Sequence, residues 1–302
     1  MSSLNASSDA VSTNFQKEIS DMMHGFGDNP NPNPSTVVLV ERIVLRQMRS
    51  LLYQAYLVAE ARGSSTITNY EVIFVMRRNM LKLKQLCDYQ LSLDALDKGI
   101  MNASFTEDEL ILELESKSKP RQRRNHIQII EELDEINEIK HIKVNPLLEE
   151  RKLRAVKLAE TIPLEMYEAF HKAKCSSFRS GASQKKTYAK LEQWVNPQKE
   201  LQITNLAMEV VGFIAYETVF ELVDSVFKVR QDAGKNHDKL LSKLNGASQN
   251  IVHMKPGLAG CSPITEAEIR EVVRRYFMPG GGMNGLFSRN MSQELPVRFI
   301  AF

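Results

Sequence analysis

The sequence predicts an all-α protein made of two similar units of three helices. Two observations support this prediction. Long segments with apolar residues at helical spacing occupy about residues 36–62 and 200–232, and each lies between shorter helical segments. The short helix that follows the long one in each unit also begins with the same residue motif. This repetition predicts that the two halves of the chain share one order of helices.

The repeated motif is a helix start. An isoleucine precedes a threonine, and a glutamate follows three residues later; these residues are Ile67, Thr68 and Glu71 in the first unit and Ile264, Thr265 and Glu268 in the second. Threonine and glutamate at this spacing form a capping box, and the isoleucine is placed to act as a hydrophobic staple. The motif predicts that a helix begins at the same point of each unit.

The first unit is expected to start with a short helix capped by Thr13 and Gln16, which ends before a proline-rich stretch. Ser35 is a plausible N-cap for the long helix, which would measure about 27 residues or roughly 40 Å. Short helices over 69–78 and on to about residue 97 complete the unit. The long helix carries apolar residues on more than one face, so we expect neighbours on more than one side.

The second unit follows a charged segment that we interpret as a flexible or partly helical connector. Amphipathic helices are expected before Gly181, with Phe178 as a possible member, and before Asn196. A polar insertion over about 234–263 separates the long helix from the last short one. The apolar tail at 295–302 is expected to pack either over this protein's own helices or into a neighbouring subunit.

Two short helices cover only part of a 40 Å helix, so each long helix must cross a second one of its kind. A histone fold meets this requirement, because its two long central helices cross in a handshake and cover each other's apolar faces. Because both copies occur here, we expect two histone folds in one chain that form an intramolecular handshake pair. The expected pairing core consists of Val44, Met48, Leu51, Val210, Phe213 and Phe220.

Longer motifs resemble two known families. The first half resembles the histone fold of the eighteen-kilodalton TFIID subunit through Phe15-x-x-Glu18-Ile19-x-x-Met22-Met23-His24-Gly25, Val44-Leu45-Arg46-Gln47 and Ile67-Thr68-Asn69-Tyr70-Glu71-Val72. The second half resembles the Spt-three (suppressor-of-Ty-three) subunit family of the SAGA coactivator through Gly212-Phe213-Ile214-Ala215-Tyr216-Glu217-Thr218-Val219 and Arg270-Glu271-x-x-Arg274-Arg275-Tyr276. The resemblance covers about residues 14–98 and 164–302.

The resemblance implies a nuclear, non-enzymatic coactivator subunit that sits in the core module of SAGA beside other histone-fold subunits. It also implies a role in recruiting the TATA-binding protein to RNA polymerase II promoters. The expected domains are a disordered tail at 1–11, an N-terminal histone fold at 12–98, a charged linker at 99–160 and a C-terminal histone fold at 161–302 with its insertion and tail. Two alternatives stay open: a histone-fold DNA-binding promoter factor, and a TFIID subunit that needs an external histone-fold partner.

Composition excludes several classes of protein. A formal net charge of +2 on 302 residues disfavours wrapping of nucleic acid, and three scattered cysteines predict neither a disulfide framework nor a zinc site. The longest apolar run is too short for a membrane span, and no signal peptide is expected. No catalytic or phosphate-binding motif occurs, and the six histidines form no metal-ligand pair. We therefore expect that the protein is not an enzyme and that it binds no small-molecule substrate, cofactor, metal or membrane.

An acidic stripe on the second long helix is the candidate site for the TATA-binding protein. Glu217, Glu221 and Asp224 recur at helical spacing, where like charges repel one another slightly. One hypothesis is an exposed docking patch for the TATA-binding protein. The alternative is a solvated face, or pairing with the arginines of the first long helix, Arg42, Arg46 and Arg49. Direct contact of these arginines with DNA is disfavoured by the balanced overall charge.

A basic cluster in the charged linker is the candidate nuclear localisation signal. It consists of Lys117, Lys119, Arg121, Arg123 and Arg124. A simple solvated run of charges explains the cluster equally well.

Overall fold

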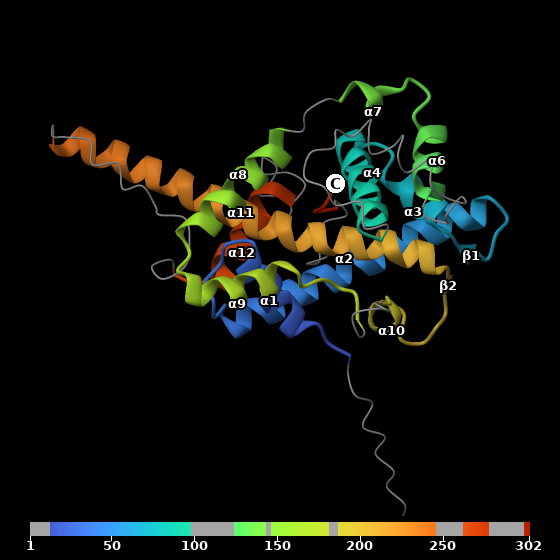
Figure 1. Ribbon diagram of the computed structural model, residues 1–302, viewed down its shortest axis with the longest axis horizontal. Coiled ribbons are helices and arrows are strands. Elements are labelled where there is room, and N and C mark those ends of the chain that lie inside the picture. The colour runs from blue at the N-terminus through green and yellow to red at the C-terminus, as the bar shows by residue number, and fades with distance from the viewer. Residues whose placement is uncertain (1–12, 98–123, 143–145, 181–186, 246–261, 278–298) are drawn as a thin grey trace, which may run out of the picture.

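The computed structural model describes residues 13–97, 124–142, 146–180, 187–245, 262–277 and 299–302 (Figure 1). These residues are mostly helical, and the strands among them are two short segments that pair with each other. The prediction of an all-α protein is therefore confirmed.

The first unit contains a short helix, a long helix and two further helices. They are α1 (Gln16–Gly25), α2 (Pro34–Ala61), α3 (Asn69–Met76) and α4 (Met80–Asp97), with strand β1 (Thr66–Ile67) between α2 and α3. Thr68 caps α3 through the predicted capping box with Glu71. The Ile67 and Val72 side chains are both fully buried, as a hydrophobic staple requires.

Two predicted helix starts in the first unit are wrong. The N-cap of α1 is Phe15 and makes no side-chain cap, so the Thr13 capping box does not form. Instead the Phe15 backbone N–H donates to Glu41 Oε1 at 2.7 Å, and the Phe15 ring is buried. The cap of α2 is Asn33, not Ser35, because Pro34 suits the first helical position, where no backbone N–H is needed.

The second unit repeats the order of short and long helices. Its elements are α9 (Leu164–Lys174), α10 (Ala189–Val195), β2 (Gln202–Ile203), α11 (Asn205–Asn245), α12 (Glu266–Val272) and the π-helix η1 (Val273–Phe277). Thr265 and Glu268 form the predicted capping box at the start of α12. Phe178 lies beyond the end of α9, in the segment that leads toward α10.

The long helix of this unit differs from the prediction at both ends. It begins at Asn205, not near 200, because residues 202–203 pair with β1. It continues to Asn245, so the segment expected to be a polar insertion from 234 starts as helix. A single glycine, here Gly234, lowers helix stability by only about 1 kcal/mol and does not end a helix by itself. Residues 246–261 of the expected insertion lie outside the described residues.

The charged connector is helical where the structure describes it. It contributes α6 (Arg124–Leu133), α7 (Glu138–His141) and α8 (Pro146–Thr161). Helix α6 packs on α3 and α4, where Ile130 is buried and the Asn69 side-chain amide is 2.9 Å from His126 Nδ1. This part of the connector is therefore docked on the first unit.

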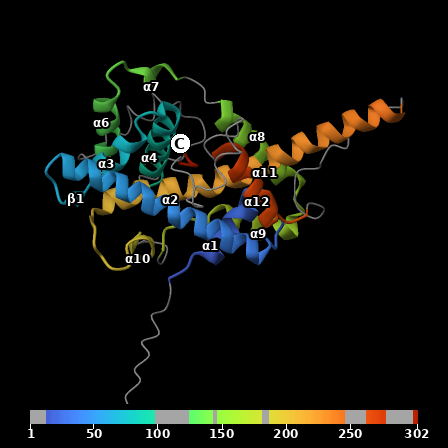
Figure 2. The ribbon, with the colours of Figure 1, turned by 180° about the vertical axis from the view of Figure 1, so that it is seen from behind.

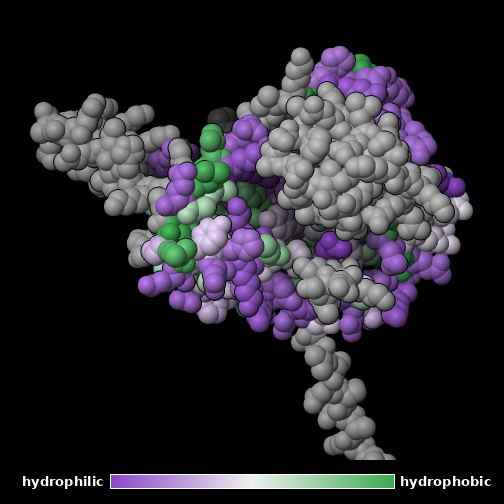
Figure 3. All heavy atoms as spheres, in the orientation of Figure 1, coloured by the Kyte–Doolittle hydropathy of each residue, from purple (hydrophilic) through white to green (hydrophobic). Residues whose placement is uncertain are grey.

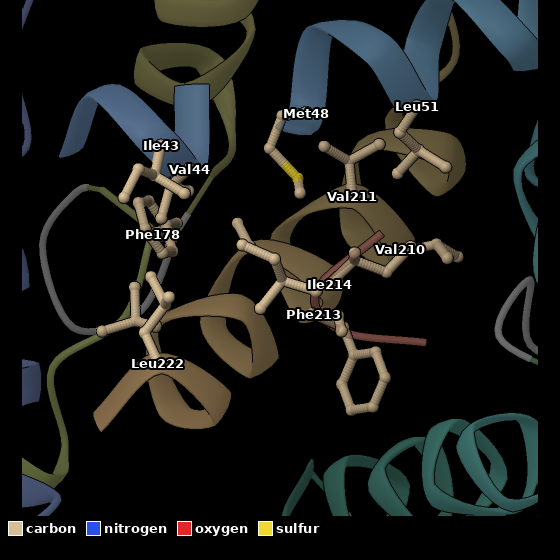
Figure 4. Close-up of a cluster of buried hydrophobic side chains, with 14 of the residues drawn as sticks. Ile43, Val44, Met48, Leu51, Phe178, Val210, Val211, Phe213, Ile214 and Leu222 are labelled. Atoms are coloured by element: carbon tan, nitrogen blue, oxygen red, sulfur yellow. The ribbon is translucent and has the colours of Figure 1, made fainter. Parts of the chain in front are cut away.

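The two long helices cross and share one core. Figures 1 and 2 show α2 and α11 crossing when the molecule is seen from the front and from behind. In Figure 4, Met48 and Leu51 of α2 point toward Val211 and Ile214 of α11. Of the six predicted pairing residues, Phe220 is only partly buried and lies outside this core, while the other five are buried in it: Val44, Met48, Leu51, Val210 and Phe213.

Contacts across the two units extend beyond the crossing. The connector after α2 pairs with the connector before α11, because β1 and β2 are parallel with Thr66 opposite Gln202. The short helices of each half also pack on the long helix of the other: α3 on α11, and α10 and α12 on α2. The two halves therefore form one interlocked body and not two separate domains.

Candidate interaction surface on the second long helix

A group of four charged side chains lies on the middle of α11. Glu217 and Glu221, one helical turn apart, face the same two cations, Lys82 from α4 and Arg151 from α8. Lys82 Nζ lies 2.6 Å from Glu217 Oε2 and 2.9 Å from Glu221 Oε1. Arg151 donates to the same two oxygens at 2.8 and 2.6 Å. We call Glu217 and Glu221 the carboxylate pair.

The balance of charge explains how these groups tolerate burial. Burial opposes ionisation of Glu217, but the charges of Lys82 and Arg151 and the hydrogen bonds from both outweigh it, so the pKa of Glu217 lies below its usual value of 4.5. Two carboxylates are matched by two cations. Removal of one partner would leave an uncompensated charge in a poorly solvated place, which is the costly case.

Arg151 also makes an apolar contact on the same surface. Its guanidinium carbon lies 3.6 Å from the centroid of the Phe220 ring, which is the distance of a close cation–π contact. Phe220 was predicted to belong to the pairing core, but α11 turns it toward α8 and Phe26, whose ring centroid is 5.0 Å away. The carboxylate pair and Phe220 together hold one arginine side chain.

The predicted exposure of the acidic stripe is wrong. Glu217 is only 7% exposed and Asp224 only 5%, and Asp224 forms an ion pair with Lys228 at 2.7 Å. Contact of these residues with the TATA-binding protein stays a hypothesis, but the structure shows them covered by the chain itself.

The predicted pairing of the stripe with arginines of the first long helix is also wrong. Arg42, Arg46 and Arg49 are exposed, because they lie on the side of α2 opposite its buried residues. Arg49 donates instead to the backbone carbonyls of Trp194 and Val195.

Lys82 and Arg151 were missed by sequence reasoning. A carboxylate on an apolar helix indicates that some cation must face it, and this was the available signal. The chain has 39 lysines and arginines, so the signal does not choose among them. Arg151 was also assigned to a connector, where no packing was expected.

A cavity of about 320 Å³ opens beside the carboxylate pair. Arg151 and Glu221 form part of its wall, and Tyr276, Phe299 and Phe302 line it as well. The chain's last residues reach this place by packing on its own helices: the Ile300 backbone N–H donates to Gln47 Oε1 at 3.1 Å. For residues 299–302, the open question of the apolar tail is thus decided in favour of packing within the chain.

The predicted nuclear localisation residues lie mostly outside the described part of the chain. Of the predicted nuclear localisation residues, Arg124 begins α6, and the other four lie outside the described residues.

Within the part of the chain that the structure describes, no three side chains are grouped as metal ligands. No helix in that part is both long and apolar enough to cross a bilayer.

The fold of the first unit defines a protein of the histone-fold class. A family model described as "Transcription initiation factor IID, 18kD subunit" matches residues 13–102, which cover α1 to α4. Transcription initiation factor TFIID subunit 13 of Arabidopsis thaliana is 31% identical over 99 residues, 33% of this chain and 77% of that protein.

Similarity to a second group of proteins extends over both units. SAGA complex subunit Spt3 of Drosophila melanogaster is 23% identical over 295 residues, which cover 94% of this chain and 73% of that protein. SAGA complex subunit Spt3 of Schizosaccharomyces pombe is 25% identical over 291 residues, 88% of this chain and 90% of that protein. The chain belongs to the family of the 18-kDa TFIID subunit, as a member of the Spt3 type. The resemblance predicted from the motifs is confirmed.

Proposed function

We propose that this protein is a transcription coactivator subunit of a SAGA-type complex and that it acts by binding, without catalysis. The observation that carries the proposal is the extent of similarity: relatives named as SAGA subunits match 94% and 88% of the chain. The match to the 18-kDa TFIID model stops at residue 102 and leaves the second unit unexplained. A role as a TFIID subunit is therefore the weaker alternative.

The second unit is proposed to be a second histone fold that pairs with the first in the same chain. The crossing of α2 and α11 supports this, as does the parallel pairing of Thr66 with Gln202. An unpaired first unit would expose the apolar face of α2, which carries Val44, Met48 and Leu51. A chain that covers this face itself needs no external histone-fold partner in order to fold.

The proposed partners are other histone-fold subunits of the complex core and the TATA-binding protein, at RNA polymerase II promoters in the nucleus. The carboxylate pair with Asp224 remains the candidate contact for the TATA-binding protein. Direct binding to DNA is the second candidate function, and the exposed arginines of α2 are the observation that favours it. The formal net charge of +2 argues against strong binding.

Co-purification tests the proposal most simply. The tagged chain is recovered from nuclear extract and its bound proteins are identified, with extract from untagged cells as the control. We expect the subunits of a SAGA-type complex. Recovery of TFIID subunits alone would contradict the proposal, and tight, salt-sensitive duplex binding by the purified chain would favour the DNA-binding alternative.

Contact with the TATA-binding protein is tested by two matched substitutions. Glu221→Gln removes a charge from the carboxylate pair, and Glu165→Gln removes a charge from an exposed glutamate of α9. We expect Glu221→Gln to weaken binding of purified TATA-binding protein about tenfold, which corresponds to about 1.4 kcal/mol, and Glu165→Gln to leave it unchanged. Equal binding by both variants would reject this contact.

The basic cluster is proposed to direct nuclear import. Alanine at Lys117, Lys119, Arg121, Arg123 and Arg124 should then retain a fluorescently tagged chain in the cytoplasm. Because import bound to a partner would mask the effect, the five residues are also fused to a cytoplasmic reporter. A reporter that stays cytoplasmic would contradict the proposal.

A further inference from the structure

Helix α8 reaches the carboxylate pair with the side chain of Arg151. Arg151 donates to Glu217 and Glu221 and stacks on Phe220, and its side chain is 11% exposed. In this arrangement an arginine meets two carboxylates and an aromatic face, which are the groups that a guanidinium binds best. Arg151 therefore occupies a site suited to an arginine from any source.

The rest of α8 packs in an unusual way for a helix docked on a core. Leu153 and Val156 are 59% and 54% exposed, while the charged Arg151 points inward. A surface helix ordinarily turns its apolar side chains toward the core and its charges toward water. The apolar surface continues onto α9 through Leu164 and Tyr167, and Figure 3 shows hydrophobic residues gathered over these two helices. Among the described side chains of α8, the inward contact is thus made by a charge, while Leu153 and Val156 face away from the core.

Lys82 limits the cost of losing Arg151, because it pairs with the same two carboxylates. It binds both carboxylates from α4, a helix of the first unit, so its two ion pairs do not depend on α8 for their atoms. One cation for two carboxylates leaves a net negative charge on the surface of α11. That state favours binding of another cation in the place of Arg151.

The cavity beside the site gives a path to it. Arg151 and Glu221 line this cavity of about 320 Å³ together with Tyr276, Phe299 and Phe302. The Phe299 and Phe302 rings stack with centroids 4.7 Å apart. A guanidinium that enters the cavity therefore meets aromatic rings beside Glu221, and aromatic rings attract guanidinium groups.

We propose that α8 is an autoinhibitory helix that covers the carboxylate pair with Arg151 and that a basic helix of a partner displaces it. The occupant is identified by the chemistry of the segment of α8 that follows Glu150: residues 151–157 carry four cationic side chains and no acidic one. The displaced α8 then offers Leu153 and Val156 for contact with the same partner. This inference rests on the proposed function only in that it describes how the candidate contact for the TATA-binding protein is regulated.

A peptide with the sequence of residues 146–161 is the probe. It is labelled with a fluorophore, and its binding to the full chain is followed by fluorescence anisotropy. In the wild-type chain the tethered α8 competes at an effective concentration on the order of 1 mM, so micromolar peptide should bind poorly. The Arg151→Gln chain should bind the peptide at least about tenfold more tightly than the wild-type chain.

Two matched controls define the interaction. A chain with Lys152→Gln loses a charge from the same helix at an exposed position and should bind the peptide as poorly as wild type. A peptide that itself carries Arg151→Gln should bind neither chain. If the folded Arg151→Gln chain shows no gain in peptide binding, or if the wild-type chain binds equally well, the inference is overturned.

Hydrogen exchange of the wild-type chain tests the same idea without a variant. The amides of α8 should exchange faster than those of α2, and excess peptide should speed exchange in α8 alone. Exchange of α8 only on global unfolding would contradict the inference. Binding of TATA-binding protein is measured separately: if α8 is released and TATA-binding protein still does not bind, the proposed contact with that protein fails and the autoinhibitory contact stands.

Discussion

Leu51→Ala is the substitution that tests the packing of the long helices most sharply. Leu51 is 0% exposed, lies on α2 and points toward Val211 of α11 (Figure 4). Truncation of a fully buried leucine removes its transfer free energy and leaves a cavity, and together these lower stability by about 2–5 kcal/mol. The walls around Leu51 belong to two long helices that are fixed along their length, so we expect about 3 kcal/mol.

The assay is urea unfolding followed by circular dichroism. With a dependence on urea of about 3 kcal/mol per molar, a loss of 3 kcal/mol moves the unfolding midpoint by about 1 M. The substitution changes helix propensity little, because leucine and alanine have similar propensities. The size of the shift therefore reports the packing between the helices.

Leu57→Ala is the matched control, since Leu57 lies on the same helix and is 44% exposed. Its effect should stay within about 0.5 kcal/mol, as for most surface substitutions. A shift of similar size in both variants, or a loss below about 1 kcal/mol for Leu51→Ala, would refute the proposed packing.

Three further substitutions test other parts of the structure. Gly212→Ala would place a Cβ atom 2.3 Å from Tyr188 Cε1. The overpacking costs about 1–3 kcal/mol, which exceeds the gain of about 1 kcal/mol in helix propensity. We therefore expect thermal unfolding to show a net loss of stability. Folding lowers the pKa of Glu217, so its ionised carboxylate stabilises the folded protein above pH 4.5. This contribution to the free energy of unfolding is lost as the pH falls below 4.5 through the lower pKa of the folded state. The difference in unfolding free energy between wild type and Glu217→Gln should therefore narrow below pH 4.5, and a difference independent of pH would contradict this explanation. Thr68→Ala should cost about 1 kcal/mol in urea unfolding by removal of the α3 cap, whereas an unchanged midpoint would argue that the cap adds nothing.

Local sequence signals predicted the helix starts that depend on neighbouring residues alone. Two of the three expected capping boxes form, at Thr68 and at Thr265, where every group of the box lies within four residues. The box at Thr13 does not form, and the Phe15 backbone N–H bonds instead to Glu41 of α2, a partner that no local signal reveals. The cap of α2 was misplaced by two residues, since Asn33 and Ser35 are both good caps on either side of Pro34. Patterns of apolar residues also predicted that α2 and α11 must cover each other.

The charged contacts could not be predicted in the same way. Lys82 and Glu217 are 135 residues apart in the sequence, and their meeting depends on how α4 and α11 cross. The spacing of Glu217, Glu221 and Asp224 fixed their common face but not whether that face meets water or another helix. The sequence predicted a charged, flexible or partly helical connector over residues 99–160, and neither its charge nor its apolar spacing reveals that α6 docks or that Arg151 points inward.

An engineered disulfide tests the central claim that the two units pair within one chain. Thr66 and Gln202 are opposite each other in the parallel pair of β1 and β2, so cysteines at both positions lie within the range of a disulfide. The substitutions Thr66→Cys and Gln202→Cys are made in a chain with Cys175→Ser and Cys261→Ser, and the dilute protein is oxidised. Pairing within one chain predicts an internally cross-linked monomer of about 34.4 kDa on a non-reducing gel, whereas cross-linked dimers would contradict it.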